Sequence, residues 1–272
     1  MKLKHWMLLT TVVACGVAQA QAPAGAGFNP GDYTGVWRMM GGTIFDRSTA
    51  EPANAAAGQP GARERPPYNA EWEKKYLARI ELVKQDKLPD PISNCGTPIG
   101  FPRIFNAPDG YEFVVTPKQT WILTENGPNT LRIYTDGRKH LPDDFIWPTY
   151  TGDSVGSWQG DTLTFTTIGL RGEDGTIVDR TGIIVSDAAH ATTQIRKPTA
   201  DAIEVKLTIE DPKAFVRPWV VTKRFTRIPG GDEIRIMDYA CAENNRNPVD
   251  ADGKTLTLDT NGKVIDAGRS RP

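Results

Sequence analysis

The sequence predicts an all-β protein with one helix near its N-terminus, and three observations support this expectation. Short runs of alternating apolar and polar residues recur from Tyr111 onward, separated by Gly, Pro, Asn and Asp. No helical periodicity lies between these runs, which argues against a parallel sheet. The 272 residues include 26 Gly and 21 Pro, which favour turns over long helices. We therefore expect an antiparallel meander that closes into a barrel, because closure removes exposed strand edges.

The first twenty residues have the pattern of a secretory signal peptide. Lys2 and Lys4 precede an apolar run, and Ala18-Gln-Ala20 provides a small-residue cleavage site. We expect a mature start at Gln21 and export to the periplasm or the medium. The apolar run is too short to cross a bilayer, so no transmembrane segment is predicted. An alternative is cleavage before Cys15, whose context resembles a lipobox and would leave a membrane-anchored lipoprotein.

Either cleavage leaves Cys95 and Cys241 as the two thiols available to each other. An oxidising compartment favours a disulfide between them. The alternative is two unpaired, buried cysteines.

Residues 21–94 are expected to hold a strand, a flexible loop and the helix. Alternating large residues predict a strand from Tyr33 to Arg38. The stretch Gly41 to Pro67, rich in Gly, Ala, Pro and Arg, is interpreted as a mobile loop that needs no core. Asn69 can cap the helix that follows. Its apolar stripe consists of Trp72, Tyr76, Ile80 and Val83. Leu88-Pro-Asp-Pro91 is expected to end it.

Residues 95–246 are assigned to the barrel domain and residues 247–272 to a C-terminal tail. Apolar alternation places Val205, Leu207 and Ile209 on an inward face, as it does Val221, Lys223 and Phe225. The predicted strands are 111–116, 120–125, 131–135, 155–159, 162–168, 192–196, 203–209, 220–228 and 234–239.

Composition and motifs exclude several function classes. The 32 Lys and Arg nearly balance 33 Asp and Glu, so no nucleic-acid partner is expected. His140 and His190 have no further ligand at metal spacing, and no Gly-rich phosphate loop is present, so no metal or cofactor is predicted. Gly152-Asp-Ser-Val-Gly156 matches a hydrolase elbow, with Asp187 and His190 following in triad order. The stretch lacks the helix that an elbow requires.

The stretch Arg132 to His140 is the strongest candidate for a site. In a strand, Tyr134 and Arg132 share one face, and the turn at Asp136-Gly137 then presents Arg138 and His140. A guanidinium and an imidazole together can bind and polarise a carbonyl, carboxylate or phenol oxygen. The alternative is surface ion pairing of these cations with Asp136 or Asp143.

Two further groups are candidates. His190 could serve as a general base oriented by Asp187, or it could be a structural histidine. Glu243 and Asn244 follow Cys241 directly, so a disulfide would hold them rigidly. Trp158 and Trp219 lie in predicted strands and could line a cavity for a flat apolar ligand.

Several blocks resemble those of a large family of exported, mostly uncharacterised bacterial proteins. They are Asp136-Gly-Arg-Lys-His140, Gly160-Asp-Thr-Leu163 and Cys241-Ala-Glu-Asn-Asn245. Gln159 and Gln194 stand where the family typically has an acid, so catalysis by those carboxylates is not expected here. Gly35-Val-Trp37 also resembles the G-x-W start of lipocalin-like barrels, and this implies a lipocalin-like barrel fold.

Two functions follow as hypotheses. The first is a cofactor-independent lyase, isomerase or cyclase acting on a small apolar or aromatic oxygenated compound, with His190, His140, Arg138 and Glu243 as catalytic groups. Its ligand contacts would be Tyr134, Asp136, Trp158, Asn244 and Trp219. The second is a non-catalytic carrier using the same barrel. The enzyme predicts histidines lining the cavity, whereas the carrier predicts an apolar interior with both histidines outside.

Overall fold

The computed structural model describes most of the chain from Tyr33 to Met237 and parts of the C-terminal segment. The described ranges are 33–50, 64–85, 98–125, 129–179, 182–230 and 233–237, with residues 87, 90 and 92 and the short stretches 249–252, 256–258, 261 and 263–265. The predicted signal peptide, Cys15, Cys95, Cys241, Glu243 and Asn244 lie outside the described residues.

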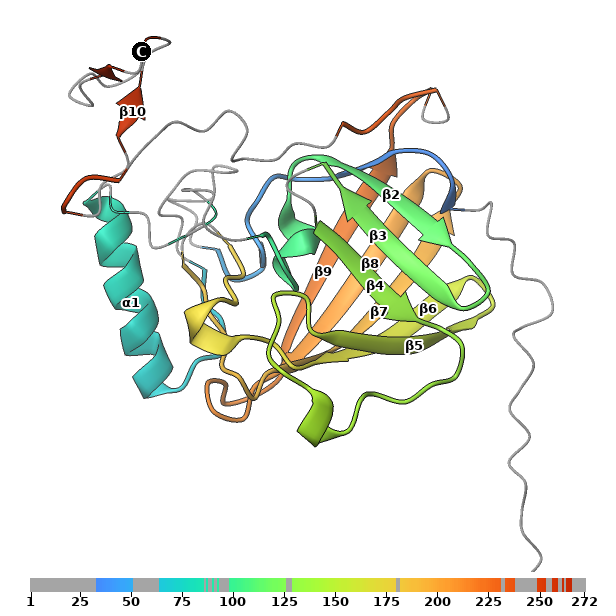
Figure 1. Ribbon diagram of the computed structural model, residues 1–272, viewed down its shortest axis with the longest axis horizontal. Helices are drawn as coiled ribbons and strands as arrows, with labels where there is room; N and C mark the ends of the chain where they lie inside the picture. Colours follow the sequence, from blue (N-terminus) through green and yellow to red (C-terminus); the bar gives the residue numbers. More distant parts are fainter. Residues whose placement is uncertain are drawn as a thin grey trace, which may run out of the picture.

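The structure confirms the all-β class and the closed barrel (Figure 1). Within the described ranges, nine strands follow one another around the ring in chain order, and β9 pairs back onto β1. They are β1 (Trp37–Met39), β2 (Gly110–Val115), β3 (Gln119–Thr124), β4 (Asn129–Tyr134), β5 (Asp153–Gln159), β6 (Thr162–Ile168), β7 (His190–Thr199), β8 (Ala202–Glu210) and β9 (Trp219–Arg227).

One pair of neighbours is parallel, which corrects the expectation of a purely antiparallel meander. The closed ring contains an odd number of described strands, nine, so neighbouring strands cannot all run in opposite directions. The exception falls between β4 and β5, where Ile133 pairs with Ser154 and Tyr134 with Val155. The connection of residues 135–152 must therefore return along the outside of the barrel, and Figure 1 shows this crossover with its short helix η5 (Asp143–Phe145).

The barrel has two ends with different covers. The first, called here the Tyr33 end, carries the tight turns at 117–118, 160–161 and 200–201. Tyr33 packs edge-on against Trp158 and donates its hydroxyl to the carbonyl oxygen of Asp161 at 2.8 Å. The Arg227 guanidinium lies 4.3 Å from the ring centre of Trp37. Aromatic rings and the cations of Arg227 and Lys197 thus close this end.

The opposite end, called here the helix end, is covered by long connections and by α1 (Ala70–Lys84) (Figure 1). The predicted cap is confirmed, because the Asn69 side chain accepts a hydrogen bond from the backbone N–H of Trp72. The predicted stripe is also confirmed: Trp72, Tyr76, Ile80 and Val83 are the buried residues of the helix. Among the described residues, no helix has the length and apolar character to span a membrane.

The prediction of a mobile, coreless Gly41–Pro67 loop is wrong for the residues of it that the structure describes at its two ends. Ile44, Phe45 and Asp46 are almost fully buried, as is Glu64. Phe45 packs against the indole of Trp219 inside the helix end. We call residues 44–46 the plug, because they fill the mouth of the barrel.

Two other expectations change. Residues 234–237 form no strand, so the strands described for the barrel end at Arg227 rather than near residue 239. β1 pairs with both β2 and β9, so the first strand belongs to the barrel and not to a separate N-terminal segment. In the tail, β10 (Thr257–Leu258) and β11 (Val264–Ile265) form a small separate sheet.

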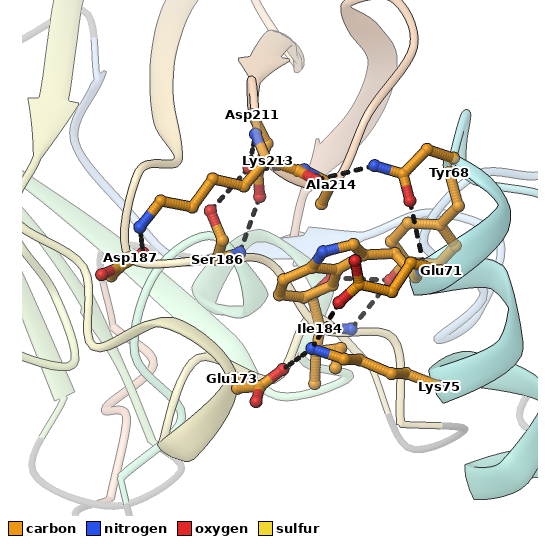
Figure 2. Close-up of polar contacts among 12 residues, drawn as sticks. Tyr68, Glu71, Lys75, Glu173, Ile184, Ser186, Asp187, Asp211, Lys213 and Ala214 are labelled. Atoms are coloured by element: carbon orange, nitrogen blue, oxygen red, sulfur yellow. Dashed lines mark hydrogen bonds and ion pairs between the residues drawn. The ribbon is translucent and has the colours of Figure 1, made fainter.

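Polar contacts fix the start of α1 to the connections of the helix end (Figure 2). The hydroxyl of Tyr68 donates to the carbonyl oxygen of Ile184 at 2.6 Å and accepts from its N–H at 3.1 Å. Nearby, Asp211 accepts hydrogen bonds at 2.6 Å from both the N–H and the hydroxyl of Ser186. These buried bonds hold the β6–β7 and β8–β9 connections between the helix and the barrel.

Replacing Tyr68 by Phe tests this anchor. The change leaves the N–H and carbonyl of Ile184 buried without their partner, so we expect a loss of about 1–3 kcal/mol in unfolding free energy. Urea unfolding measures this loss. Lys75→Met is the control, because Lys75 forms solvent-exposed pairs with Glu71 and Glu173 and its loss should change stability little. Equal stability of Tyr68→Phe and the wild type would contradict the anchoring role.

Candidate functional site

The outer wall of the barrel carries a linear array of three polar side chains around His140. Its Nδ1 lies 2.7 Å from Oδ2 of Asp153, and its Nε2 lies 2.6 Å from Oγ1 of Thr166. Asp153 begins β5 and Thr166 belongs to β6, whereas His140 comes from the crossover. A carboxylate only accepts hydrogen bonds, so Nδ1 donates to Asp153, and Nε2 accepts from the threonine hydroxyl in the tautomer that carries its single proton on Nδ1.

The crossover reaches this wall because of the parallel pair. β4 and β5 run in the same direction, and Tyr134 at the end of β4 pairs with Val155 near the start of β5, so the connection doubles back on the outer face before it enters β5. Gly152 starts β5 with φ +68°, and a side chain there would approach the carbonyl oxygen of Ile168 to 2.4 Å. The glycine thus allows the chain to enter β5 tightly beside β6.

Arg138, Asp136 and Tyr134 join the same cluster. The Arg138 guanidinium binds Asp136 through two hydrogen bonds, Nε to Oδ1 at 2.9 Å and Nη2 to Oδ2 at 2.6 Å. It also lies 4.0 Å from the centre of the Tyr134 ring. Arg138 lowers the pKa of Asp136 to about 2, chiefly through these hydrogen bonds. The ion pairing with Asp136 that was weighed as an alternative is therefore present, beside the imidazole.

His190 lies on the same outer wall, with different partners from those expected. It is half exposed on β7, and its Nε2 lies 3.2 Å from Oε2 of Glu210 on β8. Asp187, predicted to orient it, instead pairs with Lys213 at 2.6 Å. Ala191 pairs with Thr167 and Thr192 with Thr166, so His190 falls opposite the Ile168 position, diagonal to Thr166 on the neighbouring strand.

The structure therefore separates the predicted site residues into two places. Tyr134, Asp136, Arg138 and His140 lie together on the outer wall, with His190 on the same face. Trp158 and Trp219 lie inside opposite ends of the barrel: the Trp158 indole donates to Oγ1 of Thr120 at 3.0 Å, and that of Trp219 to Oδ2 of Asp46 at 2.7 Å. The enzyme hypothesis predicted histidines lining the cavity, whereas the structure places His140 and His190 on the outer wall.

The interior is largely apolar but contains buried hydroxyls. Leu163, Phe165, Ile195, Val205 and Leu207 are among its fully buried residues. Oγ1 of Thr193 and Oγ1 of Thr124 are buried and have no hydrogen-bond partner within the described part of the chain. Thr193 faces the barrel axis because it alternates with the outward Thr192. An interior ligand with an oxygen atom would find unused hydrogen-bonding groups there.

Sequence reasoning missed a cluster of buried charges behind the plug. Nζ of Lys223, already placed inward, donates to the carbonyl oxygen of Ile44 and to Oδ1 of Asn106, both at 2.8 Å. Burial lowers the pKa of Lys223 to about 8. The carboxylate of Glu64 accepts from the N–H groups of Phe45 and Asp46 at 2.8 and 2.6 Å. The one available signal was the apolar Ile44-Phe45 pair in an otherwise coreless stretch.

The pKa of the Glu64 carboxyl group is strongly shifted. Burial raises its pKa to about 9, and the nearby Asp179 carboxyl adds to the increase. Glu64 therefore carries a proton at neutral pH, which lets two carboxyls share one buried site.

The described residues form neither a metal site nor a serine nucleophile elbow. Among the described residues, no group of three or more His, Cys, Asp or Glu could hold a metal ion. Ser154 of the G-x-S-x-G stretch lies inside β5 with its hydroxyl 2.8 Å from that of Thr167, so it is not on a nucleophile elbow.

Comparison with known proteins gives limited help. No family model matches the chain, and no curated protein matches it. Among solved structures, a crystal structure of a mutant of the fluorescent protein UnaG is similar, with 12% sequence identity and a TM-score of 0.30. The match covers 72% of this chain and 96% of that chain.

The carboxyl pair predicts how stability depends on pH. Glu64 binds its proton up to about pH 9 in the folded protein, but loses it near its ordinary value of 4.5 when unfolded. The folded state therefore holds more protons between these values, and the unfolding free energy falls as pH rises from about 5 to 9. Lys223 acts in the opposite direction above about pH 8, because its folded pKa is lowered.

We expect Asp179→Asn to reduce the decrease of unfolding free energy with rising pH, but not to abolish it. The asparagine keeps an oxygen for the N–H of Ile183 but removes the charge that opposes ionisation of Glu64, while burial remains. Urea unfolding between pH 5 and 8 measures the slope. In the control, Asp187→Asn, the slope should match the wild type, because Asp187 is exposed and its pKa is lowered by Lys213. An unchanged slope in Asp179→Asn would refute the coupling.

Proposed function

We propose that the protein is an exported barrel protein that binds a small apolar or aromatic molecule bearing an oxygen atom in its interior. The observation that carries this proposal is the apolar interior, where the hydroxyls of Thr124 and Thr193 are buried and have no hydrogen-bond partner among the described residues. A buried hydroxyl without a hydrogen bond costs stability, so a protein retains one where another group can use it.

The plug offers a route of entry. Residues 44–46 are held by side-chain hydrogen bonds from Glu64, Lys223 and Trp219 rather than by strand pairing. Such contacts can be exchanged without opening the barrel wall. Lys223 and Asn106 would give the helix end a polar character, while the middle of the barrel stays apolar. An oxygenated, mainly apolar molecule matches that distribution.

Export is part of the proposal. The charged start, short apolar run and Ala18-Gln-Ala20 site support a signal peptide, and the resemblance to exported bacterial proteins supports a periplasmic or secreted location. A disulfide between Cys95 and Cys241 would fit that compartment.

Thr193→Val tests the interior site, because valine keeps the shape of threonine and removes the hydroxyl. We expect the ligand-free variant to be more stable by about 1–3 kcal/mol. We expect 1-naphthol to bind about tenfold more weakly, the equivalent of about one lost hydrogen bond. Tryptophan-fluorescence titration measures the affinity.

Thr192→Val is the matched control, since the neighbouring side chain faces outward and should leave both quantities unchanged. If neither 1-naphthol nor any member of a panel of terpenoid alcohols shows saturable binding, the proposal is refuted.

A second function is favoured by one observation, the His140 array. Asp153 orients the imidazole, and Arg138 stands in the same cluster, so this surface has the parts of an acid–base catalyst of the lyase or isomerase type. Deuterium exchange into the α-carbon of small aromatic ketones, followed by NMR in heavy water, measures such activity. His140→Gln should slow exchange by about 10²–10⁴-fold, while His190→Gln should not. Equal exchange in both variants would exclude this role of His140.

A further inference from the structure

We propose that Thr166 is a nucleophile activated by His140 and Asp153, and that the outer wall hydrolyses neutral carboxylic esters with an apolar acyl group. The proposal deepens the second function, because it uses the same dyad and adds the nucleophile and the substrate class.

The three groups have the connectivity of a nucleophile–base–acid triad. Oδ2 of Asp153 lies 2.7 Å from Nδ1 of His140, and Nε2 lies 2.6 Å from Oγ1 of Thr166. The carboxylate fixes the ring orientation and tautomer, so the lone pair of Nε2 points at the hydroxyl. Oδ2 of Asp153 also accepts a long hydrogen bond, 3.4 Å, from the N–H of Leu141, which ties it to the crossover.

The scaffold holds the hydroxyl rigidly. Thr166 lies in the middle of β6, where it pairs with Val155 on β5 and Thr192 on β7. A β-branched side chain on a strand has restricted χ1 freedom, which limits the positions of Oγ1. Thr166 is exposed, and His140 and Asp153 are partly exposed, so a substrate can reach all three. Sites on strands are more exact than sites on loops.

The surroundings indicate the substrate. The Arg138 guanidinium pairs with Asp136 and is close enough to Asp153 for their charges to interact, so a cation belongs to the surroundings of the triad. Asp143 and Asp144 in the crossover, together with Asp136, disfavour an anionic substrate. Exposed apolar side chains of the same crossover, Leu141, Phe145 and Trp147, offer contacts for an apolar acyl group.

The reaction balances without any cofactor. Oγ1 of Thr166 bonds to the ester carbonyl carbon while its proton passes to Nε2 of His140. The carbon–oxygen bond to the alcohol breaks, and the alcohol leaves with that proton. Water then attacks the acyl-threonine, giving a proton to His140 that returns to Thr166 as the carboxylic acid departs.

Two measurements test the proposal on the full-length exported protein. The first is hydrolysis of p-nitrophenyl butyrate. Thr166→Val should lose at least about a hundredfold in rate, and His140→Gln should lose about the same. Thr166→Ser should retain activity, because it restores a hydroxyl at that position. Thr192→Val, its outward neighbour on β7, is the matched control and should hydrolyse at the wild-type rate.

The second measurement is covalent labelling by an alkyl fluorophosphonate, read by peptide mass spectrometry. Attack by Thr166 breaks the phosphorus–fluorine bond, so we expect one adduct on Thr166 that is absent in Thr166→Val. Thermal unfolding of each variant confirms that the wall remains folded. The proposal is overturned if Thr166→Val keeps wild-type hydrolysis, or if no adduct forms on Thr166. If no adduct forms on Thr166 but the protein still exchanges deuterium into aromatic ketones through His140, the nucleophile role of Thr166 is refuted and the acid–base role of His140 stands.

Discussion

The structure depends on one constraint of topology: a closed ring of the nine strands described here cannot alternate in direction throughout. At least one neighbouring pair must be parallel, and a parallel pair needs a crossover connection instead of a tight hairpin. Residues 135–152 meet that need along the outer face. They carry Asp136, Arg138 and His140 with them, so the strand count decides that this polar stretch meets β5 and β6 on the outside rather than the interior.

The two ends of the barrel are closed by different kinds of interaction. Aromatic rings in edge-on and tilted contact, together with Arg227 and Lys197, cover the Tyr33 end. At the helix end, the plug is held by Glu64 and Lys223, whose pKa values are both shifted by burial toward the neutral form. The protonation states of Glu64 and Lys223 are therefore coupled to the contacts that hold the plug, at the end of the barrel where the proposed route of entry lies.

Alternation of apolar residues predicted the bounds of the strands from Tyr111 to Arg227 to within three residues, because inward and outward positions are a local property of a strand. The helix and its cap were predictable for the same reason. Which strands lie parallel is not local, so the position of His140 could not be predicted. Glu64 and Ile44 are buried by contacts with residues more than a hundred positions away, such as Lys223, and the composition of their own segment gave the opposite indication.

The same alternation explains how one wall can serve two chemistries. Two threonine pairs, 166–167 and 192–193, each place one hydroxyl outward and the next inward. Thr166 joins His140 outside, whereas Thr167 bonds Ser154 inside; Thr192 is exposed to the outer face, whereas Thr193 is buried in the apolar interior. Because adjacent residues on a strand face opposite sides of the sheet, a methyl-for-hydroxyl change at one position leaves the other face intact. The proposed interior binding and the proposed outer-wall catalysis are therefore separable by single isosteric substitutions.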